Sequence, residues 1–470
     1  MVKTVVSEAL AFLDLGILCY FLVLNTLYLV FCVVAYVRLR QYRRRWTARD
    51  LEAVMRSSAT PAISIVAPAY NEEATLADSV RSLLLLHYPQ FEVIVVNDGS
   101  TDGTIAVGER EFELARAPVS YAQPIPTQPV RGIYQSLTHP ELLLIDKENG
   151  GKADAINAGI NAARYPLVCV IDADSLLEEH SLSRAVLPFI EDPDTIAAGG
   201  IVRIANGCRV ERGRVTEVRL PDSRLALFQT VEYLRSFLAG RVAQSAMNGL
   251  LIISGAFGLF KRDAVVEVGG FRRDTIGEDM ELVTRLHRVY RERGQRFRIA
   301  FQPDPVCWTE APETLQTLAR QRNRWQRGTL QVLGYHKRMI FNPRYGVIGL
   351  FAMPYYLVFE AVGPVIELTG YALTALAIPF GLLDWRFAEL FFLAAVAYGS
   401  LLSVASVALE ELSFRRYPKL TDLLMLTAYG VLENFGYRQI ATWWRVMGIV
   451  DYYRGREGWG IMKRKGFATT

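Results

Sequence analysis

Residues 167–174 read LVCVIDAD, an apolar run of five residues followed by two aspartates with an alanine between them. The apolar run predicts a buried β-strand, and Asp172 and Asp174 follow where that strand ends. Side chains two positions apart on an extended chain point to the same side. Two carboxylates so placed supply the hard oxygen ligands that Mg²⁺ or Mn²⁺ takes while bridging substrate phosphates. We therefore expect a metal site here, with an ordinary Asp-rich turn as the alternative interpretation.

Short apolar runs alternate with helical patterns throughout residues 60–200, which predicts a parallel α/β sheet. Besides 167–171, the predicted strands are residues 62–67 (AISIVA), 91–96 (FEVIVV) and 142–145 (LLLI), and the predicted helices are residues 74–86 and 153–163. The functional loops of such sheets lie beyond the carboxyl ends of the strands. Polar stretches at those ends are therefore the candidates for the site.

Two polar stretches follow the first two predicted strands. Residues 68–72 read PAYNE, and Tyr70 and Glu72 are candidates to contact the substrate. Residues 97–103 read NDGSTDG, the composition of an ordinary turn. In the alternative interpretation, a buried Asp98 accepts hydrogen bonds from a nucleobase or a ribose.

Two further segments precede helical patterns. Residues 149–152 read NGGK, where the glycines let a phosphate approach the backbone and Lys152 adds positive charge at a helix N-terminus. Residues 275–279 read TIGED. Thr275 and Glu278 have the spacing of a capping box, which would make Asp279 only a favourable first-turn charge. Alternatively, Asp279 is a general base that deprotonates an acceptor hydroxyl. This segment alone does not separate the two interpretations.

Residues 321–325 read QRNRW on a predicted helix. Gln321, Arg324 and Trp325 are spaced i, i+3 and i+4 and therefore share one face. An arginine on that face neutralises a leaving diphosphate, and a tryptophan stacks on the apolar face of a sugar ring. In the alternative interpretation, Arg322, Arg324 and Arg327 form a basic face at a membrane surface.

Composition indicates a membrane protein with a globular middle. Hydrophobic residues make up 51% of the 470 residues, and they concentrate near the N-terminus and in the last third. The net charge of +4 is small for this length and does not suggest nucleic acid as a partner. The five cysteines are scattered without CxxC spacing, which is typical of a reducing compartment and gives no sign of structural zinc.

Residues 16–37 form a charge-free apolar run long enough to cross about 30 Å of hydrocarbon. No small-residue cleavage site follows it, so we interpret it as an uncleaved anchor that contacts the lipid bilayer. Arginines at positions 38, 40 and 43–45 follow directly. By the positive-inside rule they place the following domain in the cytosol and the N-terminus outside.

The C-terminal apolar region is less regular, and we expect three or four membrane helices there, one of them re-entrant or interfacial. Residues 346–383 are apolar for nearly two span lengths, residues 390–409 form a clean span, and residues 423–432 are short. Glu360 and Glu367 lie on one helical face within the first of these runs. Acids at membrane depth face protein or water, so they indicate either a translocation channel or a polar contact between helices.

With these motifs in this order, the chain resembles the membrane-integrated family-2 glycosyltransferases, which include cellulose, chitin, hyaluronan and poly-N-acetylglucosamine synthases. The resemblance extends from Pro61 to the C-terminal membrane region. It implies a GT-A-type (Rossmann-like) α/β catalytic domain in the cytosol, flanked by transmembrane helices. It also implies a reaction that inverts the anomeric carbon.

The resemblance further implies a role for each motif. The Asp98 loop and the Lys152 region would hold uridine diphosphate, and Asp172 with Asp174 match the metal-binding DxD pattern. Asp279 matches the base of the TED motif, although the preceding residues here are Gly277 and Glu278. Gln321, Arg324 and Trp325 match QxxRW, a motif associated with processive enzymes. Residues Ser254–Gly255–Ala256–Phe257 stand where the family often has an acceptor-site motif that contains a cysteine.

The expected organisation is an N-terminal anchor, a basic cytosolic linker, a GT-A domain, interfacial helices with QxxRW, a C-terminal membrane region and a cytosolic tail. Their ranges are residues 1–37, 38–60, 61–312, 313–343, 344–451 and 452–470. We expect an integral protein of a bacterial-type plasma membrane that transfers a hexose or N-acetylhexosamine from a UDP-sugar to a growing polysaccharide, coupled to export. The alternatives are transfer of one sugar to a membrane lipid, giving a glycolipid, and an inactive scaffold or export subunit. Whether an export partner subunit exists stays open.

Overall fold

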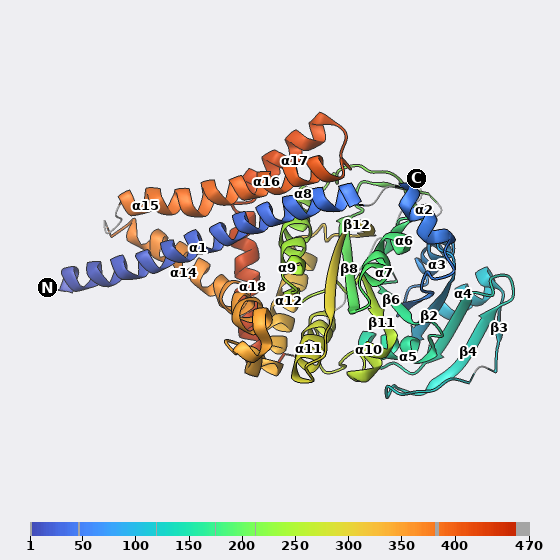
Figure 1. Cartoon of the computed structure of the whole chain (residues 1–470). Coiled ribbons are helices and arrows are strands. Elements are labelled where there is room, and N and C mark those ends of the chain that lie inside the picture. The colour runs from blue at the N-terminus through green and yellow to red at the C-terminus, as the bar shows by residue number, and fades with distance from the viewer. Residues whose placement is uncertain are drawn as a thin grey trace.

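The computed structural model describes residues 2–45, 48–118, 120–173, 175–211, 213–380 and 385–456. Figure 1 shows an α/β domain on one side and a group of long helices that extends away from it on the other. Two features expected from the sequence lie outside the described residues: Asp174 of the metal pair, and residues 457–470 of the tail.

Ten strands form one mixed sheet in the order β3-β4-β5-β2-β1-β6-β11-β8-β12-β7. In this order the strands are Leu114–Arg116, Val130–Ser136, Leu142–Lys147, Phe91–Asp98, Ile63–Ala69, Leu167–Ile171, Phe257–Lys261, Thr195–Ile204, Arg298–Thr309 and Leu176–Leu177. The four predicted strands are confirmed as β1, β2, β5 and β6, and they are parallel neighbours. The sheet as a whole is mixed, because β4, β11 and β7 run antiparallel to their neighbours.

The parallel centre of the sheet is buried on both faces, which explains its continuous apolar runs. Every residue of β6 is buried, and α5 (Lys152–Ala162) packs on β1 and β2. In the register of the sheet, Ala69 pairs with Asn97, and Asp98 pairs with Lys147. The carboxyl ends of β1, β2 and β5 therefore meet at one edge, which is where the predicted polar loops lie.

Shorter helices complete the domain. Those between the strands are α3 (Leu76–Leu84), α4 (Thr104–Phe112), α6 (Ser181–Ala185), α7 (Leu187–Glu191), α10 (Arg262–Glu267) and α11 (Glu278–Glu292). Those between the sheet and the long helices are α8 (Arg224–Tyr233), the π-helical η1 (Leu234–Arg241), α9 (Val242–Ala246) and α12 (Leu315–Tyr335) (Figure 1). The short helices η2 (Lys337–Met339) and η3 (Pro343–Tyr345) then lead toward the C-terminal region.

Among the residues that the structure describes, three helices are long and apolar enough to cross a membrane: Phe12–Arg45, Ile348–Ala377 and Trp385–Ser413. The first belongs to α1 (Val2–Arg45), which continues into the expected linker; α2 (Ala48–Arg56) follows. Within the described residues 346–380, one helix, Ile348–Ala377, is long and apolar enough to span, and α17 (Leu420–Leu432) is short. The second candidate span, Ile348–Ala377, consists of four consecutive helical segments: η4 (Ile348–Ala352), α13 (Met353–Tyr355), η5 (Tyr356–Val362) and α14 (Gly363–Ala377). The third, Trp385–Ser413, consists of α15 (Trp385–Phe392), η6 (Leu393–Ala397) and α16 (Tyr398–Ser413).

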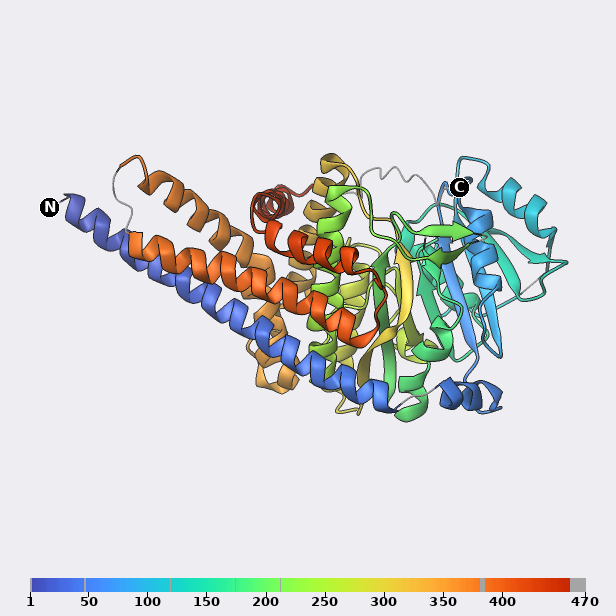
Figure 2. The same cartoon turned by 90° about the horizontal axis from the view of Figure 1, so that it is seen from above.

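The long helices are joined to the α/β domain by packing and by charge. Figure 2 shows α16 lying alongside α1. At the domain end of α16, Glu410 accepts a hydrogen bond from Arg203 of β8 at 2.7 Å, and both side chains are almost fully buried. Arg416 donates to both oxygens of Glu178 at 2.8 Å. The final helix, α18 (Tyr437–Tyr453), packs on α12, where Gly448 permits a close approach to Asn323.

Replacing Glu410 with alanine is expected to destabilise the protein, because Arg203 would stay buried without its counter-charge. Removing one partner of a buried ion pair costs about 3–5 kcal/mol. The thermal midpoint of the detergent-solubilised protein measures this loss. The double variant Arg203→Met/Glu410→Leu removes both charges, so its midpoint should lie above that of Glu410→Ala. Equal midpoints for Glu410→Ala and the wild type would contradict a structural role for the pair.

Candidate active site

Asp98 ends β2 and holds the turn that precedes α5. Its Oδ1 atom accepts hydrogen bonds from Lys147 Nζ at 2.6 Å and from the Gly150 amide at 3.0 Å. Its Oδ2 atom accepts from the Gly151 amide at 2.7 Å. Gly151 has φ +87°, a backbone conformation that favours glycine, and the space beside its α-carbon is open. The predicted burial of Asp98 is confirmed, and the structure joins it to the NGGK turn.

Lys147 and Asp154 lie beneath this turn, and sequence reasoning missed both. The side chain of Lys147 has no exposed surface, and its Nζ atom is 2.6 Å from Asp98 and 2.6 Å from Asp154. Arg273 also contacts Asp154, at 3.0 Å. The available signal was a lysine two positions after the apolar run 142–145, at the end of a buried strand, since such a position requires a counter-charge.

Tyr70 and Glu72 lie where β1 ends. Tyr70 is half exposed, and Glu72 accepts a hydrogen bond from the Thr75 hydroxyl at 2.5 Å. Asn71 accepts from the Thr101 amide at 2.9 Å, which ties the loop after β1 to the loop after β2. The turn interpretation therefore fits residues 99–103, whereas Asp98 has the separate role described above.

Lys152, Asp172 and Glu278 form a charged group beside the end of β6. Lys152 Nζ lies 2.5 Å from Asp172 and 3.4 Å from Glu278. Burial opposes the charge on Lys152, but the two carboxylates outweigh it and raise the pKa of Lys152. Burial raises the pKa of Glu278 from 4.5 to about 7, Lys152 opposes this rise, and neighbouring Asp279 adds to it. Near neutral pH, Glu278 is therefore partly protonated.

Asp279 lies in the first turn of α11 and faces the end of the 254–257 segment. Its Oδ2 atom accepts from the Gly255 amide at 3.1 Å, and its Oδ1 atom accepts from its neighbour Met280 at 2.7 Å. The capping-box interpretation is wrong, because Gly277 is the N-cap and no side chain caps the helix. Gly277 instead contacts the backbone of Gly328 on α12. This contact sets the carboxylate beside the QxxRW helix.

The QxxRW residues occupy one side of α12, and Gln321 is buried while Trp325 is 41% exposed. Arg322 donates to both oxygens of Glu232 at 2.6 and 2.7 Å, and its guanidinium lies 4.6 Å from the centre of the Trp325 ring. Arg322 and Arg327 are both buried, so the interpretation of this helix as a basic membrane-surface face is wrong. The arginines point into the protein because acidic and carbonyl partners lie there.

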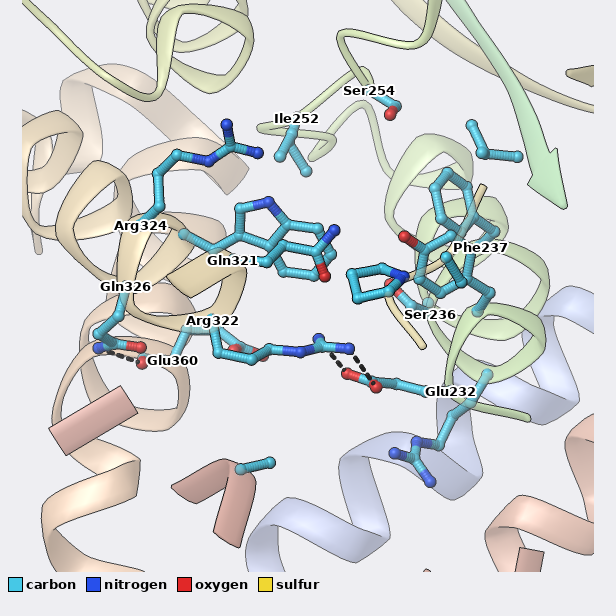
Figure 3. A pocket seen from close by; sticks show the side chains of 18 of the residues that line it. Glu232, Ser236, Phe237, Ile252, Ser254, Gln321, Arg322, Arg324, Gln326 and Glu360 are labelled. Atoms are coloured by element: carbon cyan, nitrogen blue, oxygen red, sulfur yellow. Dashed lines mark hydrogen bonds and ion pairs between the residues drawn. The ribbon is translucent and has the colours of Figure 1, made fainter. Parts of the chain in front are cut away.

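One cavity of about 800 Å³ joins these groups to the long helices. The predicted residues that line it are Lys152, Asp172, Asp279, Gln321, Arg324 and Trp325. Tyr70, Glu72 and Asp98 lie outside this lining, and Asp98 connects to it through the turn before Lys152. Figure 3 shows Arg324 and Gln321 projecting from α12 into the cavity, opposite Ser236 and Phe237.

The far end of the cavity is lined by charged pairs from the long helices. Glu360 pairs with Arg445 at 2.8 Å, and Glu367 pairs with Arg438 at 3.2 Å. Both glutamates line the cavity as well. The predicted polar contact between helices is therefore present, and the same residues face the space that a channel would need.

The residues present fit a divalent cation at Asp172. Its carboxylate faces the cavity and already holds a positive ammonium group at 2.5 Å. Asp174 lies outside the described residues, and within those residues no group of three or more potential metal ligands occurs. Asp172 would therefore hold an ion together with oxygen atoms of a bound diphosphate.

Comparison with known families decides the class of the protein. The family model described as glycosyltransferase-like family 2 matches residues 61–328, which is more than half of the chain. The chain belongs to this family. The matched part of this family 2 glycosyltransferase includes the loops after β1, β2 and β6, the base candidate Asp279 and the QxxRW motif. One enzyme family therefore accounts for all the clustered motifs.

The curated relatives of this glycosyltransferase include enzymes that make a polysaccharide. It is 32% identical over 272 residues to a poly-β-1,6-N-acetyl-D-glucosamine synthase of Staphylococcus aureus, and 31% identical to the synthase of the same name from Staphylococcus epidermidis. Each match covers 58% of this chain. The chain spans about half of the length of these relatives, 55% in each case.

Among solved structures, the glycosyltransferase is similar to a mannosyltransferase from Pyrobaculum calidifontis, determined in complex with GDP-Man and Mn²⁺. The TM-score is 0.51 at 20% sequence identity, and the alignment covers 88% of this chain and 99% of the other. This likeness agrees with the GT-A-type fold that the motifs predict.

Replacing Glu278 with glutamine is expected to change how stability depends on pH. Because the pKa of Glu278 is raised in the folded state, its contribution is fully present below about pH 4.5 and is lost as pH rises through about 7. The difference amounts to at most about 3 kcal/mol. Thermal midpoints measured from pH 5 to pH 8 should fall more steeply for the wild type than for Glu278→Gln. The exposed Glu109→Gln variant is the control, and identical slopes for all three proteins would contradict this assignment.

Proposed function

We propose that this protein transfers N-acetylglucosamine or a related sugar from a UDP-sugar to a growing polysaccharide, with inversion at the anomeric carbon. The observation that carries the proposal is the continuous cavity. At one end it is lined by Lys152, Asp172 and Asp279, and at the other by Glu360 and Glu367 of the long helices. A sugar chain elongated at the first end would have a polar path toward the membrane.

Asp279 is the proposed general base. Two backbone amides hold its carboxylate in one orientation, and its position on the cavity wall lets it reach an acceptor hydroxyl. A base within hydrogen-bond reach of the attacking hydroxyl removes the proton as the new bond to the anomeric carbon forms. Partly protonated Glu278 next to it limits the negative charge gathered around the base.

The leaving diphosphate would be held by positive groups around the first turn of α5. Lys152 lies at the N-terminus of that helix, where backbone amides also favour an anion. Arg324 approaches the same cavity from α12. A divalent ion on Asp172, with Asp174 as its predicted second ligand, would neutralise charge on the diphosphate. Arg322 stacks on one face of the Trp325 ring. The other face of the ring would stack on the acceptor sugar.

The identity of the donor is inferred from the relatives. Their name supports N-acetylglucosamine as the transferred sugar, and UDP is the nucleotide that the motif resemblance implies. The structurally similar mannosyltransferase was determined with GDP-Man, so the fold by itself does not determine which nucleobase the donor carries. Mn²⁺ in that complex supports a divalent ion in the proposed mechanism.

The orientation proposed for the chain follows from the helix ends. Arg45 at the end of α1 pairs with Glu191 of the catalytic domain at 3.7 Å, and Arg416 after α16 pairs with Glu178. Three candidate spans then bring the basic residues after α1 and after α16 to the same side, which the positive-inside rule assigns to the cytosol. At 13 residues, α17 is too short to cross.

Replacing Asp279 with asparagine is expected to lower the rate of sugar transfer by about 10²–10⁴-fold, because the acceptor hydroxyl would lose its base. Membranes containing the protein are supplied with radiolabelled UDP-N-acetylglucosamine, and incorporation is measured. Asp263→Asn is the matched control, since that carboxylate is 90% exposed on the surface. Normal incorporation by Asp279→Asn would remove Asp279 as the base.

The same reaction separates the three activities considered for the wild type. A high-molecular-weight product on a gel is the expected result. A product no larger than a lipid carrying one sugar would replace the polymer with a glycolipid. No incorporation and no binding of any UDP-sugar with Mg²⁺ or Mn²⁺ would identify an inactive scaffold.

Removing divalent ions with EDTA is expected to abolish transfer, and adding Mn²⁺ or Mg²⁺ is expected to restore it. Asp172→Asn should raise the metal concentration needed for half-maximal activity by at least about tenfold, because a ligand is lost. The measurement is transfer rate against the concentration of free metal. Full activity in metal-free buffer would contradict a role for the ion.

A further inference from the structure

Four of the arginines that line the cavity are each neutralised by a glutamate, whereas Arg241 makes no ion pair among the described residues. The pairs are Arg235 with Glu433, Arg322 with Glu232, Arg438 with Glu367 and Arg445 with Glu360. Arg241 also lines the cavity, but its Nη1 atom is buried without a hydrogen-bond partner among the described residues. Burial accordingly lowers the pKa of Arg241, whereas Glu232 outweighs burial at Arg322 and raises its pKa.

The position of Arg241 is fixed rather than variable. It is the last residue of η1, and π-helical turns occur frequently at functional sites. Its guanidinium lies 3.8 Å from the centre of the Phe237 ring, so stacking holds the plane of the group. Asp279 is near enough for its charge to act on Arg241. Arg241 and the proposed base Asp279 also line the same cavity.

Two buried amides face the same cavity with an unpartnered oxygen. Gln244 follows Arg241 by one helical turn, and Gln321 belongs to α12 on the other side. Each side chain is more than nine-tenths buried, and the Oε1 atom of each has no hydrogen-bond partner among the described residues. Figure 3 shows the Gln321 amide pointing across the cavity toward Ser236 and Phe237. A buried polar group without a partner is costly, so a ligand is expected to supply the missing hydrogen bonds.

The combination of donors and acceptors selects the chemistry of that ligand. Arg241 offers N–H groups only, whereas the two amide oxygens require hydrogen-bond donors. An ionised phosphate or carboxylate would satisfy the arginine but carries no hydrogen-bond donor for the two amide oxygens as they are oriented here. A neutral pyranose carries hydroxyls that both donate and accept, and its apolar face suits the aromatic rings of Phe237 and Trp325 in the cavity.

We propose that Arg241 and Gln244 of the η1–α9 segment, together with Gln321, form the subsite that binds the terminal sugar of the acceptor and presents its hydroxyl to Asp279. This inference rests on the proposed function. It assigns acceptor recognition to a segment outside the motifs DxD, TED and QxxRW. Arg241 and Gln244 are thus specificity-determining residues for the acceptor and not for the nucleotide donor.

The test measures the two substrates separately with purified full-length protein in lipid nanodiscs. The probes are UDP-N-acetylglucosamine as donor and a synthetic β-1,6-linked N-acetylglucosamine pentamer as acceptor. Arg241→Gln and Gln244→Leu should each raise the KM for the pentamer at least tenfold while changing the KM for the donor less than twofold. Arg110→Gln, whose side chain is 70% exposed on α4, is the matched control and should keep both constants.

Two other results would overturn the inference. If Arg241→Gln raises the KM for the donor, the Arg241 guanidinium binds the diphosphate instead of the acceptor. If neither the KM for the pentamer nor the KM for the donor changes, Arg241 binds neither substrate. Folding is checked by the thermal midpoint: because Arg241 makes no ion pair among the described residues and burial disfavours its charge, Arg241→Gln should melt close to the wild type. A midpoint well below the wild type would make the residue structural. Failure of the wild type to use any UDP-sugar would instead refute the proposed function itself.

Discussion

A lysine side chain without exposed surface lies under the proposed donor half of the site, between two aspartates that neutralise it. An ammonium group is stable away from water only when its charge and its hydrogen bonds are matched, so Lys147 fixes both Asp98 and Asp154. Asp98 in turn holds the amides of Gly150 and Gly151. The direction in which Lys152 leaves the turn follows from that constraint, and so does its contact with Asp172.

The proposed acceptor half, around Asp279 and the QxxRW helix, depends on close backbone packing instead of charge. Gly277 and Gly328 bring the N-terminus of α11 against α12, and Gly448 brings α18 against the opposite side of α12. A side chain at any of these positions would separate the base, the QxxRW helix and the membrane helices. The single cavity that contacts all three exists because these helices approach one another so closely.

The parts of the site that sequence analysis predicted are those encoded locally. The strand Leu167–Ile171 has the predicted bounds, and Asp279 lies on a helix start as expected, because apolar runs and helix starts are short-range patterns. The roles of Lys147 and Arg241 depend on neighbours from distant segments, which no local pattern reports. Pro364 lies in the first turn of α14, where a missing amide is tolerated, so the helical run continues through it.

The length of α1 has a consequence for where the chemistry takes place. Its candidate span, Phe12–Arg45, has 34 residues and is about 51 Å long, whereas the hydrocarbon layer measures about 30 Å. The surplus lies against the catalytic domain, where the Tyr42 hydroxyl donates to Asp304 at 3.4 Å. The length of this helix therefore determines how far the proposed active site lies from the bilayer. The loss of one helical turn would draw the site about 5 Å toward the lipid headgroups.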